Sequence, residues 1–405
     1  MAEDKKHSIL APSAASRWLA CPPSALLAEQ AGEDAGSTYA AEGTLAHRLA
    51  ELYLRDFLIG REWMAAHPNM DYDPGKENPE GLAALADAVH NPLYYRGMLD
   101  EVKVYTDYVV KLYDKAGAGT RMMVEAEVPL FYKPDDCGTI DSLVCGGDRT
   151  LYVTDLKFGK GVKVDARDNK QLLIYAISAL DMLMAMDATP GIDRVVMTIV
   201  QPRLHHTSVW ELAVADLDIE RDLIDTGARK ALAGEGKLKT GDHCRFCPVK
   251  PRCRALKELA AETARKQFDD PALLSTNEIA ALLGSLDTIS DWIASVKKYA
   301  LNQALDGTRY AGYKLVAGPS RRKITDEPAL LKALTAAGYD EVLLRRWSLV
   351  TLSELEKIVT KEDFSKTCTQ FIARTESAPT LVAATDPRPE YGIAKAVEDF
   401  AEFDK

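Results

Sequence analysis

Two aspartates and a lysine on neighbouring segments have the types and spacing that metal-assisted phosphodiester hydrolysis requires. Asp155 and Lys157 are two residues apart in an apolar segment, so on a strand their side chains project from the same face. A carboxylate holds a hard divalent cation through oxygen. A lysine beside it can orient or help to deprotonate the attacking water. Alone, an Asp-x-Lys pattern is also common on exposed strands, and it would then favour a solvated edge.

Asp141, in the preceding strand-like segment, changes this interpretation. If the two segments form a hairpin through the turn at residues 146–150, Asp141 and Asp155 lie across from each other. Two carboxylates at close range repel unless a cation lies between them. We therefore predict that they are paired metal ligands. The alternative is that one of them faces solvent.

Two helical segments are expected to add polar groups. His47 is a nitrogen donor that suits Mn²⁺ better than Mg²⁺, and Glu51, one turn later, shares its face. Glu51 would ligate through water or hold the imidazole, although a surface role fits equally well. Gln171 and Tyr175 are also four residues apart and could position a phosphate or the lysine amine. Each of these residues alone is more typical of an ordinary helix.

Four cysteines form a second set with metal-binding spacing. Cys244, Cys247 and Cys253 follow the pattern C-x2-C-x5-C, and Cys21 lies more than two hundred residues earlier. Four thiolates suit an iron–sulfur cluster or zinc, which would staple the two ends of one domain together. The other three cysteines are predicted to be small buried thiols: Cys137, Cys145 and Cys368.

The elements that must position these groups follow in the order helix, three strands, helix, strand. We expect a helix over 40–60, a second from Met98 to Gly117 or Gly119, strands at 122–132, 138–147 and 151–159, a helix over 169–187 and a strand at 194–204. Residues 66–84, rich in Pro, Asn, Asp and Gly, indicate a surface loop. The order predicts an α/β architecture with a mixed sheet flanked by helices.

Composition sets outer bounds on the protein class. The chain has 405 residues, which suggests two domains or one heavily decorated domain. Its 47% hydrophobic and 27% charged residues are ordinary for a globular protein. The N-terminus lacks the apolar core of a signal peptide, so we expect a cytoplasmic protein that no membrane segment anchors. The net charge of −11 argues against indiscriminate nucleic-acid binding but allows a local basic groove. Five cations surround the Asp-x-Lys motif: Lys157, Lys160, Lys163, Arg167 and Lys170.

Together these motifs resemble the RecB-type branch of the PD-(D/E)XK nuclease superfamily. The matching pieces, in the family's order, are G-T-x-x-H at 43–47, G-x-x-D at 138–141, D-x-K at 155–157 and Q-x-x-x-Y at 171–175. The cysteines are arranged as in iron–sulfur-stapled members, such as AddB-type nuclease domains and CRISPR-adaptation exonucleases. One cysteine precedes the core there and three follow it. The resemblance covers about residues 8–260, and Ile140 stands where the family often has proline.

The resemblance implies a domain organisation. Residues 1–265 would form a restriction-endonuclease-like mixed sheet flanked by helices and closed by the four-cysteine cluster, with an insertion at about 60–96. Residues 266–405 would form a mainly helical accessory domain. The whole chain is also similar to a phage- and prophage-borne family with this core.

The resemblance also implies roles for individual residues. One or two Mg²⁺ or Mn²⁺ ions would be held by His47, Asp141, Asp155 and the Leu156 carbonyl. Lys157 would orient or activate the water, Gln171 and Tyr175 would support the ligands, and Glu125 would help a second ion. A [4Fe–4S] cluster, or alternatively zinc, would be bound by Cys21, Cys244, Cys247 and Cys253.

The implied function is a metal-dependent deoxyribonuclease, an exonuclease that acts in phage or prophage DNA recombination. Implied partners are DNA and a single-strand annealing protein or a separate helicase, since the chain has no G-x-x-x-x-G-K-[ST] phosphate loop. The alternative is a catalytically silent or partner-activated DNA-binding protein of the same fold. A redox protein built around the cluster would leave the other motifs unexplained. Polarity, endonuclease action, RNA cleavage and oligomeric state stay open.

Overall fold

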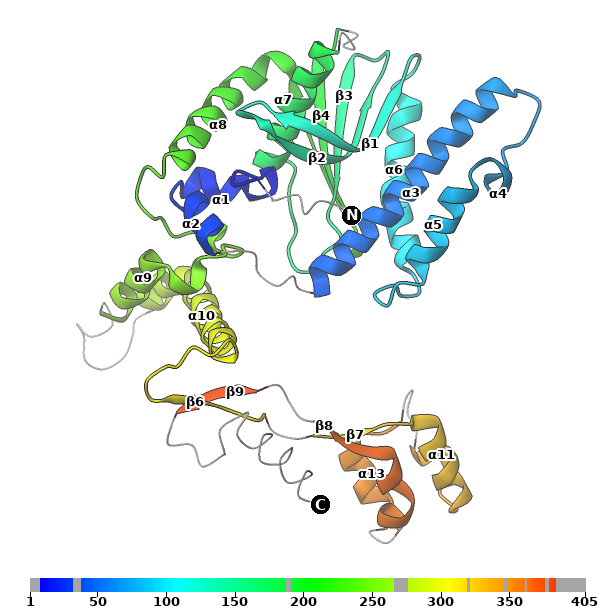
Figure 1. Cartoon of the computed structure of the whole chain (residues 1–405), viewed down its shortest axis with the longest axis vertical. Helices are drawn as coiled ribbons and strands as arrows, with labels where there is room; N and C mark the ends of the chain where they lie inside the picture. Colours follow the sequence, from blue (N-terminus) through cyan, green and yellow to red (C-terminus); the bar gives the residue numbers. More distant parts are fainter. Residues whose placement is uncertain are drawn as a thin grey trace. The chain divides into compact units, whose positions relative to one another are not determined.

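The computed structural model describes residues 8–31, 38–186, 191–265, 276–318, 321–344, 349–360, 363–375 and 379–383. The chain divides into two compact units, Met1–Trp292 and Ile293–Lys405. The first unit holds a five-stranded sheet with helices packed on both faces (Figure 1).

The sheet has the strand order β1-β2-β3-β4-β5. Its strands are β1 (Arg121–Leu130), β2 (Lys133–Cys145), β3 (Thr150–Leu156), β4 (Arg194–Gln201) and β5 (His206–Ala213). The β3–β4 pair is parallel and the other three pairs are antiparallel. A parallel pair needs a crossover, and α7 (Lys170–Ala185) provides it. The prediction of an α/β architecture with a mixed sheet is confirmed.

Two hydrophobic clusters pack on opposite faces of the sheet. One cluster joins the sheet to α7, α8 (Leu217–Leu232) and α1 (Ala15–Ala20). The other joins it to α3 (Thr38–Ala66), α5 (Pro79–Val89) and α6 (Met98–Lys115). Side chains alternate along β3, so Val153 belongs to the first cluster and Leu156 to the second.

Strand β2 is longer than predicted. It begins at Lys133, so the Pro-Asp-Asp run lies inside the strand, and the turn that closes the β1–β2 hairpin is at Phe131–Tyr132. Strand β3 pairs only with Ser142–Cys145. The first half of β2 therefore lacks this neighbour, and proline is tolerated where no ladder hydrogen bond is required.

The predicted loop at 66–84 is wrong. Helix α3 continues to Ala66, and α4 (Pro74–Glu77) and α5 follow. The side chains of Asp73 and Asn78 cap these two helices by accepting hydrogen bonds from the amides of Gly75 and Gly81. An Asp or Asn cap followed by proline starts a helix, so the residues that suggested a loop are helix-start signals here.

Strand β5 and helix α8 were not predicted. Residues along β5 alternate between half-buried and exposed, which is the period-2 signal of an edge strand. Helix α2 (Ser24–Ala31) follows α1, and α9 (Arg254–Arg265) follows the last cysteine. Cys145 and Cys368 are buried as expected, but Cys137 is exposed, so its prediction as a buried thiol is wrong.

The region beyond residue 266 combines helices with short strands. Its helices are α10 (Thr276–Leu305), α11 (Glu327–Ala336), α12 (Glu341–Leu344) and α13 (Leu352–Ile358). Two two-stranded sheets pair β6 (Tyr313–Val316) with β9 (Thr380–Ala383) and β7 (Arg321–Ile324) with β8 (Ile372–Thr375). Among the residues described, no helix has the length and apolar character needed to cross a membrane.

Candidate metal centre and cysteine site

Three carboxylates occupy the same level of three adjacent strands. Val124 pairs with Ser142, Ala126 pairs with Ile140, and Ser142 pairs with Thr154. Glu125, Asp141 and Asp155 are each the next residue along their strands from these pairs. Asp141 therefore lies between Glu125 on β1 and Asp155 on β3. The hairpin predicted between the two aspartate-bearing strands is therefore present.

Side chains along a strand normally alternate between the two faces of the sheet, but this alternation is interrupted in β1 and β2 at the level of the carboxylates. On β1, Val124 packs with α3 and α6, whereas Ala126 packs on the α7 side. Glu125 lies between them with a φ of 50°, a left-handed conformation that costs roughly 1–3 kcal/mol for a residue other than glycine. On β2, Ile140 and Leu143 both face α7 across the same point. Helices on both faces can consequently reach the carboxylates.

His47 on α3 approaches from one face. Its Nδ1 lies 3.2 Å from Asp141 Oδ1 and 3.8 Å from Glu125 Oε1. The three side chains offer ligand atoms within 4.8 Å of one another, the arrangement expected around one metal ion. Burial alone would lower the pKa of His47, but Asp141, Glu125 and Asp155 raise it to about 10. Without a metal, the imidazolium supplies positive charge among the carboxylates at neutral pH, and a metal ion that binds His47 would displace its proton.

Lys157 and Gln171 approach from the α7 face and hold Asp155. The Lys157 ammonium donates to Gln171 Oε1 at 3.0 Å, and Gln171 Nε2 donates to Asp155 Oδ1 at 2.9 Å. Lys157 Nζ also lies 3.0 Å from Asp155 Oδ2, although this buried oxygen accepts no hydrogen bond of good geometry. Burial raises the pKa of Asp155, which Lys157 partly opposes. Burial would lower the pKa of Lys157, but Asp155 raises it.

A backbone contact ties β2 to β3 at the site. The Leu156 amide donates to Asp141 Oδ2 at 2.6 Å, while Asp141 Oδ1 faces His47. The Leu156 side chain is buried on the opposite face, with α3 and α6. Asp141 therefore has one fixed oxygen and one that is directed toward the other polar groups.

Tyr175 explains the glycine of the G-x-x-D motif. Its ring is buried beneath the site, and a Cβ on Gly138 would lie 2.9 Å from Tyr175 Cε1 and 3.1 Å from Leu130 Cδ2. Only glycine lets the strand pass this close to the ring. Burial, followed by the nearby Asp155, raises the pKa of Tyr175, so its hydroxyl stays protonated.

Cys21 and the segment that carries Cys244, Cys247 and Cys253 approach each other within the first unit. The Lys239 amide donates to Cys21 Sγ at 3.5 Å, and Cys244 Sγ donates to the Lys239 carbonyl at 3.8 Å. Burial raises the pKa of the Cys244 thiol, and Cys253 and Cys21 raise it further. Burial also raises the pKa of Cys247, again with contributions from Cys244 and Cys253. These four thiols, all within the described residues, include no three that lie within 4.8 Å of one another.

Comparison with known proteins places the chain in a family. A family model described as "Protein of unknown function (DUF2800)" matches residues 7–389. The chain belongs to the DUF2800 family. Nine chains of solved structures also match. One, titled "Crystal structure of SSO0001", is 14% identical with a TM-score of 0.24, over 51% of this chain and 85% of that one. The family description assigns no activity, so a function for this DUF2800 protein must come from its residues.

Two predicted features lie apart from the centre of this DUF2800 protein. Glu51 accepts hydrogen bonds from Arg48 at 2.7 Å and Arg55 at 2.8 Å on the surface of α3, so these arginines, rather than the imidazole, hold it. Gly43 lies inside α3 and not at its start, and a Cβ there would meet nothing within 4 Å. The fold therefore gives no steric reason for glycine at this position.

Two further residues support the site and were missed in the sequence. Gln201 is buried at the end of β4, where its side chain bonds the backbone of Val162 and Val164 at 2.9 and 2.8 Å. It thereby anchors the loop that follows Lys157. The sequence feature that could have indicated both residues is the run Gln-Pro-Arg at 201–203, which ends an apolar strand with two polar side chains.

Arg203, the last residue of that run, joins both helices of the α3–α6 face to the sheet. It pairs with Glu42 at 2.8 Å and with Glu101 at 3.7 Å. Its guanidinium lies 5.0 Å from the ring centroid of Phe158. It therefore fixes the N-terminal part of α3, on which His47 lies.

Proposed function

We propose that this DUF2800 protein is a metal-dependent deoxyribonuclease of the RecB type and that it acts as an exonuclease. One observation carries the proposal: three carboxylates in register, with His47 on one side and the Lys157–Gln171 pair on the other. Its place in phage or prophage DNA recombination, with an annealing protein or helicase as partner, rests on the resemblance.

The donor set fits a hard divalent cation. Carboxylate oxygens suit Mg²⁺ and Mn²⁺, and an imidazole nitrogen shifts the preference toward Mn²⁺. His47, Asp141 and Glu125, whose ligand atoms lie within 4.8 Å of one another, would hold one ion. Asp155 and the Leu156 carbonyl, which the resemblance implies as further ligands, would complete this site or hold a second ion. Asp155 Oδ2 lies 3.0 Å from the Lys157 ammonium, so a metal ion bound to this oxygen would share it with the lysine. When bound, the ion lowers the pKa of water and stabilises charge on the phosphate.

Lys157 would act as a hydrogen-bond donor. Asp155 and Gln171 fix its ammonium, and its raised pKa keeps it charged at neutral pH. It would therefore orient the attacking water and neutralise a phosphate oxygen, rather than remove a proton. Gln171 positions the lysine, and Tyr175 packs beneath both strands.

Cys21, Cys244, Cys247 and Cys253 would bind a [4Fe–4S] cluster. The approach of Cys21 to the segment of Cys244, Cys247 and Cys253 supports this assignment, and four thiols would also suit zinc. In either case the role would be structural, because closing a loop of more than two hundred residues restricts the unfolded chain strongly. Absorbance at about 400 nm in anaerobically purified protein distinguishes iron from zinc.

The deciding experiment compares Lys157→Ala with Lys111→Ala, which replaces an exposed lysine on α6. Each protein is incubated with end-labelled linear DNA and with closed circular DNA, in Mg²⁺, Mn²⁺ or EDTA. We expect metal-dependent degradation of linear DNA that only Lys157→Ala abolishes. Cutting of the circle would indicate an endonuclease. If folded wild-type protein cuts neither DNA, the alternative of a catalytically silent or partner-activated DNA-binding protein is favoured.

A further inference from the structure

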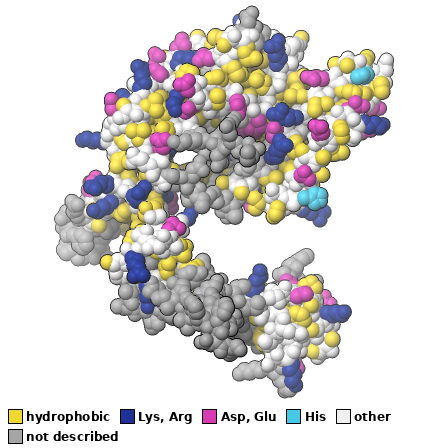
Figure 2. Space-filling model, in the orientation of Figure 1, with side chains coloured by type: hydrophobic (Ala, Val, Ile, Leu, Met, Phe, Trp, Pro, Cys, Tyr) yellow, Lys and Arg dark blue, Asp and Glu magenta, His cyan; other side chains and the backbone are white. Residues whose placement is uncertain are grey.

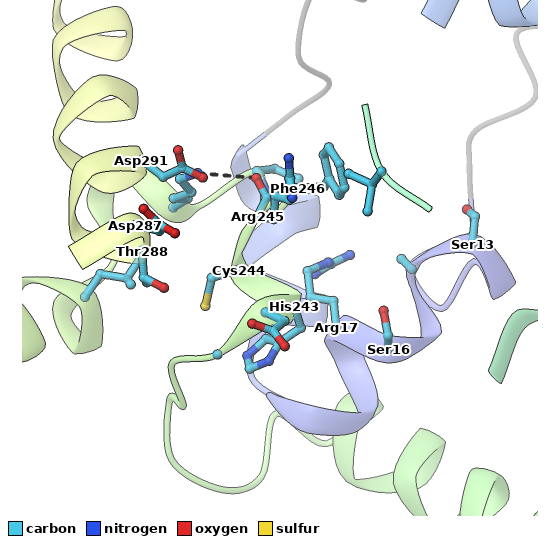
Figure 3. Close-up of a pocket in the computed structure, with 17 residues that line it drawn as sticks. Ser13, Ser16, Arg17, His243, Cys244, Arg245, Phe246, Asp287, Thr288 and Asp291 are labelled. Carbon is cyan, nitrogen blue, oxygen red and sulfur yellow. Dashed lines mark hydrogen bonds and ion pairs between the residues drawn. The ribbon is translucent and has the colours of Figure 1, made fainter. Parts of the chain in front are cut away.

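A cavity of about 800 Å³ lies beside the cysteine site in the first unit (Figure 3). Three structures line it: the N-terminal turn and α1, the cysteine knuckle (residues 241–253), and the first half of α10. The main polar side chains of the first wall are Ser13, Ser16 and Arg17, and those of α10 are Asp287, Thr288 and Asp291.

Phe246 is the aromatic side chain in this cavity. It lies on the turn between Cys244 and Cys247 and is 81% exposed. The Arg245 guanidinium is 5.7 Å from its ring centroid. Val162, 37% exposed, lines the same space. An exposed ring on a short constrained turn is a stacking surface that loses little entropy when a flat ligand binds.

The cavity is within short reach of the candidate metal centre. Val162 follows Lys157 by five residues, which span at most about 18 Å. At about 3.4 Å per stacked base, this corresponds to about five nucleotides. The loop between them is held to the sheet by Gln201 and by Ser208, whose hydroxyl accepts from the Ala166 amide at 2.9 Å. The two places are therefore connected by an anchored segment.

Charge in and around the cavity suits one nucleic-acid strand. Arg17 and Arg245 line the cavity, and Arg17 also donates to the Ser24 carbonyl at 2.6 Å. Lys160 and Lys163 are exposed on the anchored loop. The α10 wall is acidic, with Asp291 3.6 Å from Lys250. Carboxylates repel phosphates but accept hydrogen bonds from the N–H groups of bases, which include the imino group of thymine. Figure 2 shows acidic and basic side chains interspersed on the visible face, as expected for a local track rather than a broad basic surface.

We propose that this cavity holds bases of single-stranded DNA next to the metal centre, with Phe246 as the stacking surface. The phosphates would follow Arg17, Arg245 and the loop lysines, and the bases would enter between Phe246 and the α10 wall. A single strand is required because bases inside a duplex have no free face for the ring. The inference rests on the proposed function in one respect: the bound strand is the substrate.

The test is equilibrium binding in EDTA, where no cleavage occurs. Fluorescence anisotropy is measured with a labelled oligothymidylate of 20 nucleotides and with an abasic strand of the same length and charge. The variants are Phe246→Ala, Phe246→Trp and the control Tyr313→Ala, which removes an exposed aromatic from β6 in the other unit. Melting temperature and cluster absorbance are recorded for each.

We expect Phe246→Ala to weaken binding of oligothymidylate by roughly 5- to 150-fold, the range for loss of one base stack. Binding of the abasic strand should stay unchanged, and Phe246→Trp and Tyr313→Ala should bind like wild type. Equal losses for both strands, or no loss with oligothymidylate, would overturn the proposal. If Phe246→Ala melts early, Phe246→Leu replaces it, because leucine keeps apolar bulk without a ring.

The outcome separates this inference from the nuclease proposal. If DNA is cut and the Phe246 variants bind normally, the cavity inference alone fails. If base-dependent binding through Phe246 is found but no DNA is cut in Mg²⁺ or Mn²⁺, the nuclease proposal fails and the cavity remains a single-strand binding site.

Discussion

The metal centre and the cysteine site both join residues from distant parts of the chain, but they do so in different ways. Asp141, Asp155 and Glu125 are placed by strand register, and helices packed on both faces bring His47 and Gln171 to them. The cysteines lie on short turns closed by local backbone hydrogen bonds, and Lys239 links Cys21 to Cys244. The sheet therefore positions the residues of the metal centre. The cysteine site instead joins two segments outside the sheet, one at Cys21 and one at Cys244–Cys253.

This difference predicts different consequences of mutation. The sheet would keep its shape when a ligand of the metal centre is replaced, so activity should fall while stability is maintained. The turns that carry the cysteines depend on the group that they bind, so stability should fall there first. Four substitutions test this contrast.

Asp141→Asn should have the largest effect on activity. Asparagine has nearly the same shape and can still accept from the Leu156 amide, but it removes the charge beside His47. We expect cleavage to fall by about 10²- to 10⁴-fold with a melting temperature close to wild type. Single-turnover cleavage and thermal unfolding measure the two quantities. A large loss of stability would show that the centre also holds the fold together.

Cys247→Ser should have the largest effect on stability. Releasing a closed loop of more than two hundred residues removes up to about 5 kcal/mol from the free energy of unfolding. We expect a colourless protein that unfolds early in urea. The control, Cys137→Ser, changes an exposed thiol and should behave like wild type. Normal unfolding of Cys247→Ser would show that the thiols bind nothing structural.

Gln171→Leu should have an intermediate effect on activity. Leucine keeps most of the side-chain volume but loses the bridge between Lys157 and Asp155. The ammonium would then be less well oriented, and we expect about a 10- to 100-fold lower single-turnover rate. Gln171→Glu, which restores an acceptor for Lys157, should recover part of the rate. Equal rates for the leucine and glutamate variants would exclude a positioning role for the amide.

Glu125→Gly should have the smallest effect and the opposite sign on stability. Glycine adopts the left-handed conformation without strain, and one repelling carboxylate is removed. We expect a gain of about 1 kcal/mol in unfolding free energy with a lower cleavage rate. Arg149→Gly, also at positive φ but away from the centre, should leave cleavage unchanged. If Glu125→Gly destabilises the protein, its carboxylate contributes to the fold.

The sequence predicts much of the metal centre because its geometry is local. Residue spacing in two strands joined by a short turn is enough to place Asp141 opposite Asp155. It does not reveal the reversal of faces at Glu125, which depends on a single backbone angle. It also does not show that Glu51 is held by Arg48 and Arg55 instead of by the imidazole of His47. All of these side chains lie within helical reach of Glu51 on α3, so spacing does not choose between them.

Elements were missed where a signal had two meanings or was weak. Pro, Asp and Asn at residues 73–79 suggested a loop, yet they start two helices, and apolar side chains of the second, α5, pack on α3 and α6. Strand β5 has only a half-buried face, so its hydrophobic pattern is faint. The cavity at Phe246 depends on elements more than two hundred residues apart and could not be read from spacing.

The contact between Gly138 and Tyr175 has a consequence for the evolution of this family. A side chain at position 138 would collide with the ring, and relief could come only from a smaller residue at position 175. The two positions should therefore change together: relatives with alanine or serine at 138 should lack a large aromatic at 175. Such coupled substitutions would mark which members keep this strand–helix spacing and which have remodelled it.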